Sequence, residues 1–435
     1  MFILNQEHTY AALDVGTSSV RIVVGEVASG ALNIIGAGEV PSSGLKKGAI
    51  VDIDDTVQSI RKAVEKGEQM LGTKITSVIV GITGNSIELQ SCNGIVAVSS
   101  DDKEIREEDI HRVLDAAKVV SIPPDREIVD VIPSQFIVDG LEEIHDPRGM
   151  IGVRLEMQGT LITGSKTVLH NLYRCVEKAG LEPSEGVLLP LGAGSIALSD
   201  DEKALGTAVM DIGGGTTTVS VFENGVLKAV RQLPVGGEHI TNDISLGMRI
   251  STEKAEGIKK QEGHALMDDA SDDELFEVPK IGSEELQEFS QWQLAGIIEP
   301  RAEEIYTMAA KEIYRAGFND LPGGIVLTGG TMNMPGMLEL AREIFENNIR
   351  TSIPDYIGVR GPEYTNSIGA LTFAYRNAKI QGKSLQHALE GRPGRADPQP
   401  VPEKSREKRN RPEPAGSEGP GMKQKVSKFF KSFLE

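Results

Sequence analysis

Apolar and polar residues alternate near the start of the chain and again about two hundred residues later. This alternation favours half-buried strands. The predicted strands of the first stretch are Tyr10–Val15, Val20–Val27, Leu32–Glu39 and Ser77–Ile82. A helical pattern interrupts them over Asp54–Leu71, and the second stretch places strands around Asp211. The repeat predicts an α/β protein built from two related halves.

Between about 84 and 164 the pattern changes to short alternating strands. The predicted strands are Ser86–Gln90, Gly94–Ser99, Arg126–Phe136 and Met157–Ile162. One helix is predicted near Glu107–Val119, and Pro-rich or Gly-containing turns separate the pieces. None of the glycine turns described below falls in this block. We therefore interpret it as an inserted α+β subdomain that contacts other proteins.

The second half of the chain is richer in helical patterns. A helix is predicted at Lys166–Ala179, and further helices at Glu238–Gly263 and from Glu284 to Arg315. An acidic loop, Met267–Glu277, separates the last two groups. The folded part is predicted to end near Asn377.

The stretch from Gln381 to Gly421 holds seven prolines, mixed charges and almost no large apolar residues. Such a segment cannot bury enough surface to offset its ordering entropy, so we expect a disordered linker over 379–421.

The last residues, 422–435, carry apolar and basic residues at helical spacing. The apolar positions form one face: Met422, Val426, Phe429, Phe430, Phe433 and Leu434. The basic positions lie on or beside the opposite face: Lys423, Lys425, Lys428 and Lys431. This helix is too short to span a bilayer, but it is suited to lie in the interface of an anionic membrane. The alternative is a terminal helix docked on the protein's own body.

Two glycine turns repeat the same chemistry at the ends of equivalent strands. They contain Gly16, Thr17, Ser18 and Ser19 in the first copy, and Gly213, Gly214, Gly215, Thr216 and Thr217 in the second. Glycines let the backbone approach a ligand, and successive amides with hydroxyls form a nest for phosphate. Asp14 and Asp211 head the two turns and are suited to hold a hydrated Mg²⁺. A single copy would more often be an ordinary hairpin, but recurrence favours a two-sided phosphate clamp.

A third glycine-rich stretch, Gly323–Gly336, follows a buried strand and precedes a helix that begins near Pro335. Taken alone, it is typical of an ordinary strand-to-helix loop.

Composition and charge exclude some partners and indicate the compartment. The chain has 435 residues, a formal net charge of −19 and two cysteines, Cys92 and Cys175. We expect no nucleic-acid partner for so acidic a chain, and the cysteine usage suits a reducing compartment. The N-terminus shows no basic segment before its short apolar stretch, so we expect neither a signal peptide nor a transmembrane segment.

The two turns and the third stretch, in this order, resemble the phosphate 1, phosphate 2 and adenosine motifs of the actin-like ATPase superfamily. Smaller matches agree with this resemblance: Gly236 and Gly237 after the second turn, then Glu256 and Lys259, which resemble the superfamily's ribose contacts. The resemblance implies an actin-like (ribonuclease-H-like) fold of two lobes around a nucleotide cleft, with ATP and Mg²⁺ as cofactors. In the adenosine motif it assigns Gly329, Gly330 and Met332 to the nucleotide. Without the resemblance, Glu256 and Lys259 would be interpreted as a solvated helix face.

With the inserted block and the amphipathic end included, the chain resembles the FtsA family of bacterial cell-division proteins. This resemblance implies a polymer-forming protein on the cytoplasmic face of the membrane at the division site. It implies FtsZ and later divisome proteins as partners, the latter through the inserted subdomain. The segment Ile297–Arg301 matches a family pattern, which makes Arg301 the candidate contact for the FtsZ C-terminal tail. The alternative for Arg301 is a solvated charge in the first turn of a helix.

The resemblance divides the chain into five parts. They are a first lobe at 9–83 and 165–198, the inserted subdomain at 84–164, a second lobe at 199–378 with its FtsZ-binding part at about 238–318, the linker at 379–421 and the membrane helix at 422–435.

One departure from the superfamily bears on catalysis. Leu189 precedes Pro190 where DnaK-type ATPases carry a glutamate that positions the attacking water. We therefore expect tight nucleotide binding with weak hydrolysis, and we assign no catalytic residue. The alternatives are a small-molecule kinase of the same superfamily, for which no acceptor base is evident, and a pilus-assembly adaptor of the PilM type, which lacks this linker and terminal helix.

Overall fold

The computed structural model describes residues 8–28, 30–279, 286–346 and 348–389. The first lobe is built on a five-stranded sheet in the order β11-β6-β1-β2-β3. Its strands are β1 (Thr9–Val15), β2 (Ser19–Ala28), β3 (Ala31–Pro41), β6 (Ser77–Ile82) and β11 (Glu182–Leu188). β1 pairs antiparallel with β2 and parallel with β6, so the turn after β1 lies at the carboxyl edge of β6 as well. All four strands predicted for this region are confirmed to within two residues.

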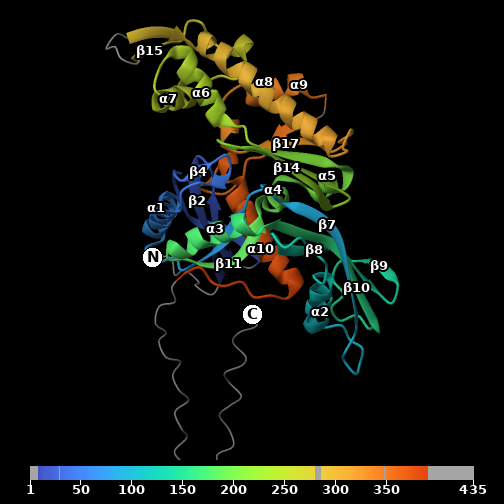
Figure 1. Ribbon diagram of the computed structural model, residues 1–435. Coiled ribbons are helices and arrows are strands. Elements are labelled where there is room, and N and C mark those ends of the chain that lie inside the picture. Colours follow the sequence, from blue (N-terminus) through green and yellow to red (C-terminus); the bar gives the residue numbers. More distant parts are fainter. Residues whose placement is uncertain (1–7, 29, 280–285, 347, 390–435) are drawn as a thin grey trace, which may run out of the picture. The chain divides into compact units, whose positions relative to one another are not determined.

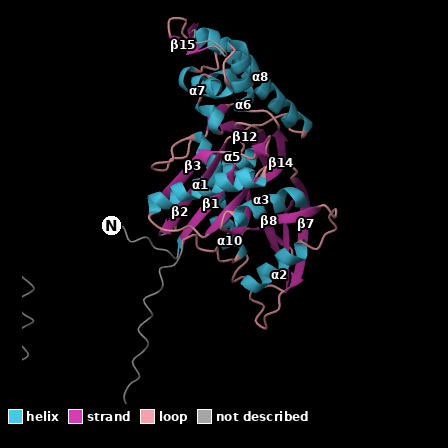
Figure 2. Cartoon of the chain, turned by 60° about the vertical axis from the view of Figure 1, so that its left-hand side comes forward, coloured by secondary structure: helices cyan, strands magenta, loops and turns pink. Residues whose placement is uncertain are grey.

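Helices cover both faces of this sheet. α1 (Ile53–Leu71) and α3 (Lys166–Lys178) pack together over one face (Figure 2). α1 begins where the Asp52 side chain accepts a hydrogen bond from the Asp55 amide, and it ends at Gly72 in the left-handed conformation. A short hairpin, β4 (Leu45–Lys46) and β5 (Ala49–Ile50), precedes it.

The last helix, α10 (Thr365–Gln381), covers the opposite face of the first sheet, although its residues were assigned to the second lobe. Ala370, Leu371 and Ala374 pack with Tyr10 and Ala12 of β1. The assignment of 365–378 to the second lobe is therefore wrong for this helix, because its small apolar residues pack on the free face of the first sheet. Figure 1 shows the course of α10. Nothing in the local pattern distinguishes the two sheets as partners.

α10 crosses α4 (Leu189–Ala197) at very short range. A methyl group added to Gly369 would lie 2.2 Å from the Gly192 carbonyl oxygen, so neither glycine can carry a side chain at this crossing. α4 also packs on the second lobe through Leu191, Ala193 and Ala197. The two helices together form the packed link between the lobes.

The second lobe repeats the first in its sheet order, β14-β13-β12-β17-β18. Its strands are β12 (Thr207–Ile212), β13 (Thr217–Glu223), β14 (Val226–Leu233), β17 (Gly324–Thr328) and β18 (Ile349–Thr351). α5 (Asp200–Leu205) precedes the sheet, and four helices bury its outer face: α6 (Gly237–Met248), α7 (Thr252–Glu262), α8 (Gln291–Arg315) and α9 (Met337–Ile344). The helices predicted over Glu238–Gly263 are confirmed as α6 and α7, with Arg249 in the left-handed conformation between them.

The prediction of helix from Glu284 onward is wrong at its start. Residues Leu286–Ser290 form strand β16, which pairs with β15 (Leu275–Pro279), and α8 begins only at Gln291. The aromatic rings of Phe276 and Phe289 stack across this hairpin at 6.3 Å. Part of the predicted acidic loop is therefore strand, while Met267–Asp269 forms a 3-10 turn.

The inserted block forms a four-stranded sheet in the order β7-β10-β8-β9 with α2 (Glu107–Ala117) packed against it (Figure 1). Its strands are β7 (Glu88–Ala97), β8 (Arg126–Val138), β9 (Leu141–Ile144) and β10 (Arg154–Ser165). The two strands predicted at Ser86–Gln90 and Gly94–Ser99 are one strand, because Gly94 does not turn the chain. It lets α2 approach, since a methyl group there would lie 2.0 Å from the Val113 carbonyl oxygen.

The predicted start of the linker at 379 is too early. α10 continues to Gln381, and Leu385, Ala388 and Leu389 are buried. The Ala388 amide donates to the Thr9 carbonyl at 2.8 Å, and the Thr76 amide donates to the Ala388 carbonyl at 2.8 Å. This segment is ordered because the side chains of Leu385, Ala388 and Leu389 pack against the first lobe. The rest of the linker and the helix predicted at 422–435 lie outside the described residues.

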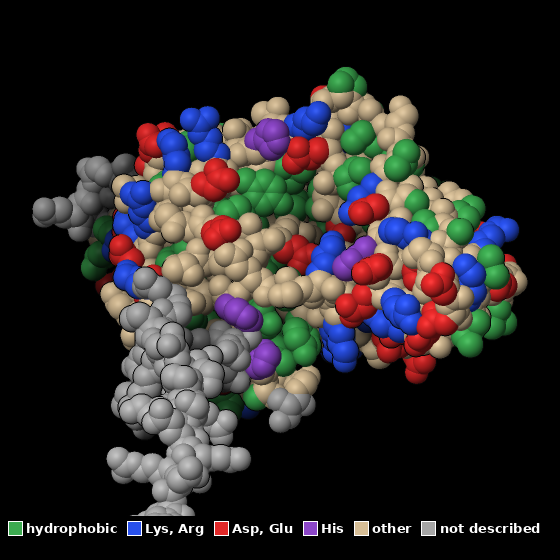
Figure 3. All heavy atoms as spheres, turned by 90° about the horizontal axis from the view of Figure 1, so that it is seen from below, with side chains coloured by type: hydrophobic (Ala, Val, Ile, Leu, Met, Phe, Trp, Pro, Cys, Tyr) green, Lys and Arg blue, Asp and Glu red, His purple; other side chains and the backbone are tan. Residues whose placement is uncertain are grey.

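On the face seen in Figure 3, Lys and Arg side chains are interspersed with Asp and Glu. Within the ranges described above, no helix is both long and apolar enough to cross a bilayer.

The α4–α10 crossing yields a prediction with a matched control. Gly369→Ala should destabilise the protein by about 1–3 kcal/mol, because the new methyl forces two backbones apart. Gly257→Ala is the control, since a methyl group at Gly257 of α7 meets nothing within 4 Å. It should be neutral or stabilise by up to about 1 kcal/mol. Thermal denaturation of both variants would contradict this account if they shifted the midpoint equally.

Candidate functional site

A cavity of about 1120 Å³ is bounded by both lobes. This volume is ample for a nucleotide-sized ligand. Most of the residues predicted to bind nucleotide or metal line it: Asp14, Gly16, Thr17, Ser18, Ser19, Asp211, Gly213, Gly214, Gly215, Thr216, Gly237, Glu256, Lys259, Gly329 and Gly330. The fold therefore gathers residues that are spread over more than three hundred positions of sequence.

The two glycine turns have the same geometry. The Gly16 amide donates to the Ser19 carbonyl at 3.0 Å, and the Gly213 amide donates to the Thr216 carbonyl at 2.9 Å. Each turn thus closes tightly between the last residue pair of an antiparallel ladder. The equivalence follows from the repeated strand–turn–strand sequence.

The turns also touch one another across the cavity. A methyl group on Gly214 would lie 1.6 Å from Ser18 Oγ, and one on Gly215 would lie 2.5 Å from Thr17 Cγ2. Only glycine allows this approach. Backbone amides and hydroxyls from both lobes therefore meet in one small volume, which fits the phosphate chain of a nucleotide.

Two carboxylates are buried at the heads of the turns. Burial raises the pKa of Asp14 to about 6. The Arg21 charge opposes this rise, while the charges of Asp211 and Glu39 add to it. Burial also raises the pKa of Asp211, against the hydrogen bond that Asn366 Nδ2 donates to Asp211 Oδ2 at 2.8 Å. A bound cation would stabilise the ionised forms of both carboxylates. The pair is therefore suited to a divalent metal held through water.

No group of three or more His, Cys, Asp or Glu side chains in the described parts of the chain is arranged to hold a metal directly. The Mg²⁺ prediction therefore rests on Asp14 and Asp211 alone.

At another part of the cavity wall, α6 and α7 are joined by a polar cluster. Lys259 Nζ donates to Thr241 Oγ1 at 2.7 Å, to Glu256 Oε2 at 2.6 Å and to the Gly237 carbonyl at 3.0 Å. Burial lowers the pKa of Lys259, and the Glu256 charge partly offsets that effect. Burial acts to raise the pKa of Glu256, but the Lys259 charge and its hydrogen bonds lower it overall. The cluster holds a carboxylate and an ammonium in fixed positions beside the cavity, as ribose hydroxyls require.

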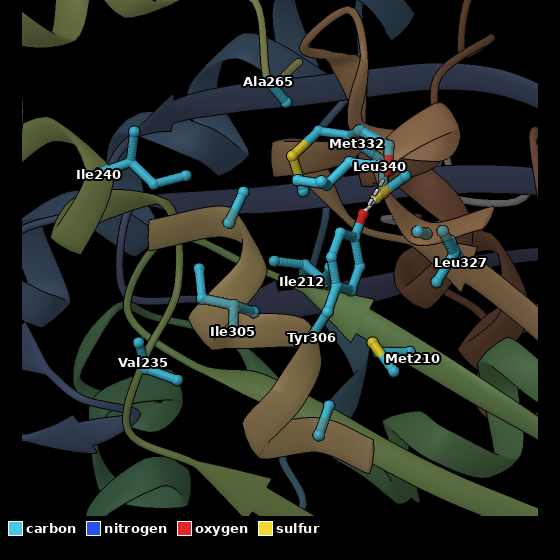
Figure 4. Close-up of a cluster of buried hydrophobic side chains, with 14 of the residues drawn as sticks. Met210, Ile212, Val235, Ile240, Ala265, Ile305, Tyr306, Leu327, Met332 and Leu340 are labelled. Atoms are coloured by element: carbon cyan, nitrogen blue, oxygen red, sulfur yellow. Dashed lines mark hydrogen bonds between the residues drawn. The ribbon is translucent and has the colours of Figure 1, made fainter. Parts of the chain in front are cut away.

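Three predicted residues do not line the cavity. Thr217 turns inward and donates to the Val235 carbonyl at 2.8 Å. Gly236 supports the second turn, since a methyl group there would lie 2.4 Å from the Gly213 carbonyl oxygen. Met332 is buried in the core of the second lobe beside Tyr306 (Figure 4). Met334 lines the cavity instead. The Met332 side chain therefore does not line the cavity to which the resemblance assigned it, because it lies in the 3-10 turn Gly330–Asn333 and packs into the core.

Sequence reasoning missed several polar residues of the cavity: Arg21, Glu39, Glu238, Asn242, Glu363 and Asn366. Arg21 pairs with Glu39 at 2.8 Å, and its guanidinium lies 5.8 Å from the centre of the Tyr364 ring. Arg21 projects from β2 on the same side as the turn, a position that strand alternation could have indicated. Asn366, in the first turn of α10, reaches Asp211 of the second lobe, and no local sequence signal marks it.

Arg301 lies on α8 and not in a first helical turn. Its Nε donates to Asp243 Oδ2 of α6 at 2.5 Å, and it also pairs with Glu304. The alternative of a freely solvated charge is therefore wrong. Its side chain remains 29% exposed, so a partner can still reach it.

Burial of Asp14 gives a pH-dependent prediction. A rise of its pKa from 3.8 to about 6 corresponds to about 3 kcal/mol of destabilisation once the carboxyl is ionised. The native state binds the extra proton, so stability is lost as the pH rises from about 4 through 6.

Asp14→Asn should therefore unfold at higher temperature than the natural protein at pH 7.5 and at nearly the same temperature at pH 4. Asp54→Asn, at a surface carboxylate that is 92% exposed, is the control and should leave both values unchanged. An equal gain at both pH values would refute the assignment.

Comparison with known proteins agrees with this geometry. The family model described as "Cell division protein FtsA" matches residues 208–369, and the one described as "SHS2 domain inserted in FTSA" matches residues 84–163. Cell division protein FtsA of Bacillus subtilis (strain 168) is 56% identical over 382 residues, which cover 88% of this chain and 87% of that protein.

Two similar solved structures extend the comparison to the fold. MreB5 of Spiroplasma citri bound to ADP aligns with a TM-score of 0.52 at 15% identity, over 86% of this chain and 99% of that one. A PilM-PilN type IV pilus biogenesis complex aligns with a TM-score of 0.57 at 17% identity, over 83% and 98%. The predicted actin-like α/β fold with an inserted subdomain is confirmed. Identity of 56% over 88% of this chain also establishes its family, and the chain belongs to the FtsA family of cell-division proteins.

Proposed function

We propose that this protein binds ATP with Mg²⁺ and polymerises on the cytoplasmic face of the membrane at the division site. There it anchors FtsZ filaments and helps to recruit later divisome proteins. The observation that carries the nucleotide part is the meeting of two glycine turns, one from each lobe, beside the buried acids Asp14 and Asp211. Membership of a cell-division family supports the rest.

The chain's own residues have distinct tasks in this proposal. The amides and hydroxyls of the two turns hold the phosphates, and the cluster of Thr241, Glu256 and Lys259 orients the ribose. Asp14 and Asp211 would hold a hydrated Mg²⁺, whose charge would offset that of the carboxylates, and a nucleotide held by both turns would contact both lobes. Binding should therefore fix the lobes in one arrangement, as a polymer subunit requires.

Leu189 accounts for the weak hydrolysis that we propose. It lines the cavity at the start of α4, is 4% exposed and packs with the α10 core. An apolar side chain there cannot orient water. Phosphoryl transfer depends on positioning the nucleophile, so the chemical step should be slow while binding is retained.

We expect the purified protein to hydrolyse Mg-ATP more slowly than about 1 s⁻¹, a low value for an enzyme. Phosphate release at saturating ATP, after the affinity has been measured, checks this expectation. Lys259→Ala serves as the control, because any release that survives loss of the ribose cluster comes from a contaminating ATPase. A rate well above 1 s⁻¹ that Lys259→Ala abolishes would refute weak hydrolysis.

The membrane and partner parts rest on other residues. The basic amphipathic segment 422–435 lies outside the described residues, and its sequence supports the proposal of a membrane anchor. Arg301 is the proposed contact for the FtsZ C-terminal tail. The Asp243 carboxylate holds its guanidinium in a fixed direction, which lowers the entropy cost of binding an acidic group.

Sedimentation with anionic liposomes tests the anchor. The full chain should pellet with vesicles and carry FtsZ with it, while a chain ending at Gly421 should stay in the supernatant. Neutral vesicles are the control, because each lysine near an anionic surface contributes about 1 kcal/mol. If truncation changes nothing, or if FtsZ stays in solution, the anchoring function is refuted, and a screen of small phosphoryl acceptors would test the kinase alternative.

A further inference from the structure

One hydrogen bond joins the first glycine turn to the second lobe. Ser18 Oγ, between β1 and β2, donates to Glu238 Oε1 at 2.7 Å. Glu238 lies in the first turn of α6, directly after the glycine pair that supports the second turn. The bond therefore bridges the two lobes at the point where their phosphate turns meet.

The Glu238 carboxylate is held in this place by the backbone. Its amide donates to the Gly214 carbonyl at 2.8 Å, and the preceding Gly237 amide donates to the Gly213 carbonyl at 2.9 Å. A methyl group on Gly214 would meet Ser18 Oγ at 1.6 Å and Glu238 Oε1 at 3.4 Å. The hydroxyl, the carboxylate and the second turn thus lie within contact distance of one another.

The chemistry of the two side chains makes this bond an alternative to phosphate binding. A serine hydroxyl has one proton to donate. Carboxylate and phosphate oxygens are both anionic acceptors, and two such groups at close range repel each other. While Ser18 donates to Glu238, the same proton is not available to a phosphate, and the carboxylate charge opposes the approach of one.

We propose that Glu238 competes with the nucleotide phosphates for Ser18, and that in their absence it holds the two lobes together. This inference rests on the proposed nucleotide-binding function and adds a regulatory residue to the same site. Nucleotide binding then exchanges an internal carboxylate bridge for a phosphate bridge. The competition weakens binding of the phosphate groups only, so it does not change the contribution of the base and ribose to affinity.

Affinities for adenosine, ADP and ATP test the competition. Glu238→Ala should tighten binding of ADP and ATP about 10-fold or more, and leave adenosine within about 2-fold. Glu238→Gln removes the charge and keeps an acceptor, so it should give a smaller gain. Glu303→Ala is the control, because it removes one negative charge from an exposed position of α8 outside the cavity.

A double-mutant cycle gives a second readout. Ser18→Ala should weaken ADP binding more in the Glu238→Ala background than in the natural protein, because only there is the hydroxyl proton free for phosphate. Additive effects would show that the two residues do not compete.

Two outcomes would overturn the inference. The first is unchanged or weaker ADP binding by Glu238→Ala with an unchanged melting temperature, which would make Glu238 a contributor to binding. The second is an equal gain for adenosine, which would remove the specificity for phosphate.

A measurement without nucleotide separates this inference from the proposed function. Spin labels at Glu65→Cys of α1 and Lys311→Cys of α8 report the distance between the lobes, and the native Cys92 and Cys175 are buried. Glu238→Ala should broaden that distance distribution, whereas Glu303→Ala should not. If the natural protein bound no nucleotide, the proposed function would fail. An unchanged distribution would overturn the bridge.

Discussion

The constraint on which the structure depends is the burial of two like charges at one place. Asp14 and Asp211 head the two glycine turns, and burial raises the pKa of both. An ionised pair of this kind is costly in the interior of a protein. Arg21 and Asn366 offset part of that cost. The remaining electrostatic cost of the two carboxylates is one that a bound cation would offset.

Both lobes contribute to this site, Asp14 from the first and Asp211 from the second. Glycine lets the two turns approach one another, and the glycines of the α4–α10 crossing let the two linking helices touch backbone to backbone. α10 also connects the second lobe with the inserted subdomain. Its first turn donates from Asn366 to Asp211, and near its end Asn377 donates to Asp130 of the inserted subdomain at 2.9 Å. One helix thus contacts both the cavity between the lobes and the inserted subdomain.

Leu189 at the start of α4 and the Ser18–Glu238 hydrogen bond between the turns both favour a structural role for the proposed nucleotide. In the proposed function, the apolar Leu189 side chain leaves the attacking water unoriented, and the Ser18–Glu238 bond would make phosphate binding an exchange between two acceptors. If a nucleotide fixes the arrangement of the lobes, as proposed, slow hydrolysis would prolong that arrangement and the Ser18–Glu238 bond would define the arrangement without nucleotide. Both features suit a structural role better than a metabolic one.

The sequence by itself determined the elements and the chemistry that repeats. The turns at Gly16 and Gly213–Gly215 were predictable because glycine and aspartate after an alternating strand have few other structural solutions. The cavity residues Arg21, Glu238 and Asn366 and the inward position of Met332 were decided only by tertiary structure. Each depends on which surface a helix or turn packs against, and that choice is made by residues far away in sequence. For the same reason the sequence did not reveal where α10 packs. Its apolar pattern indicates that the helix is buried but not against which sheet.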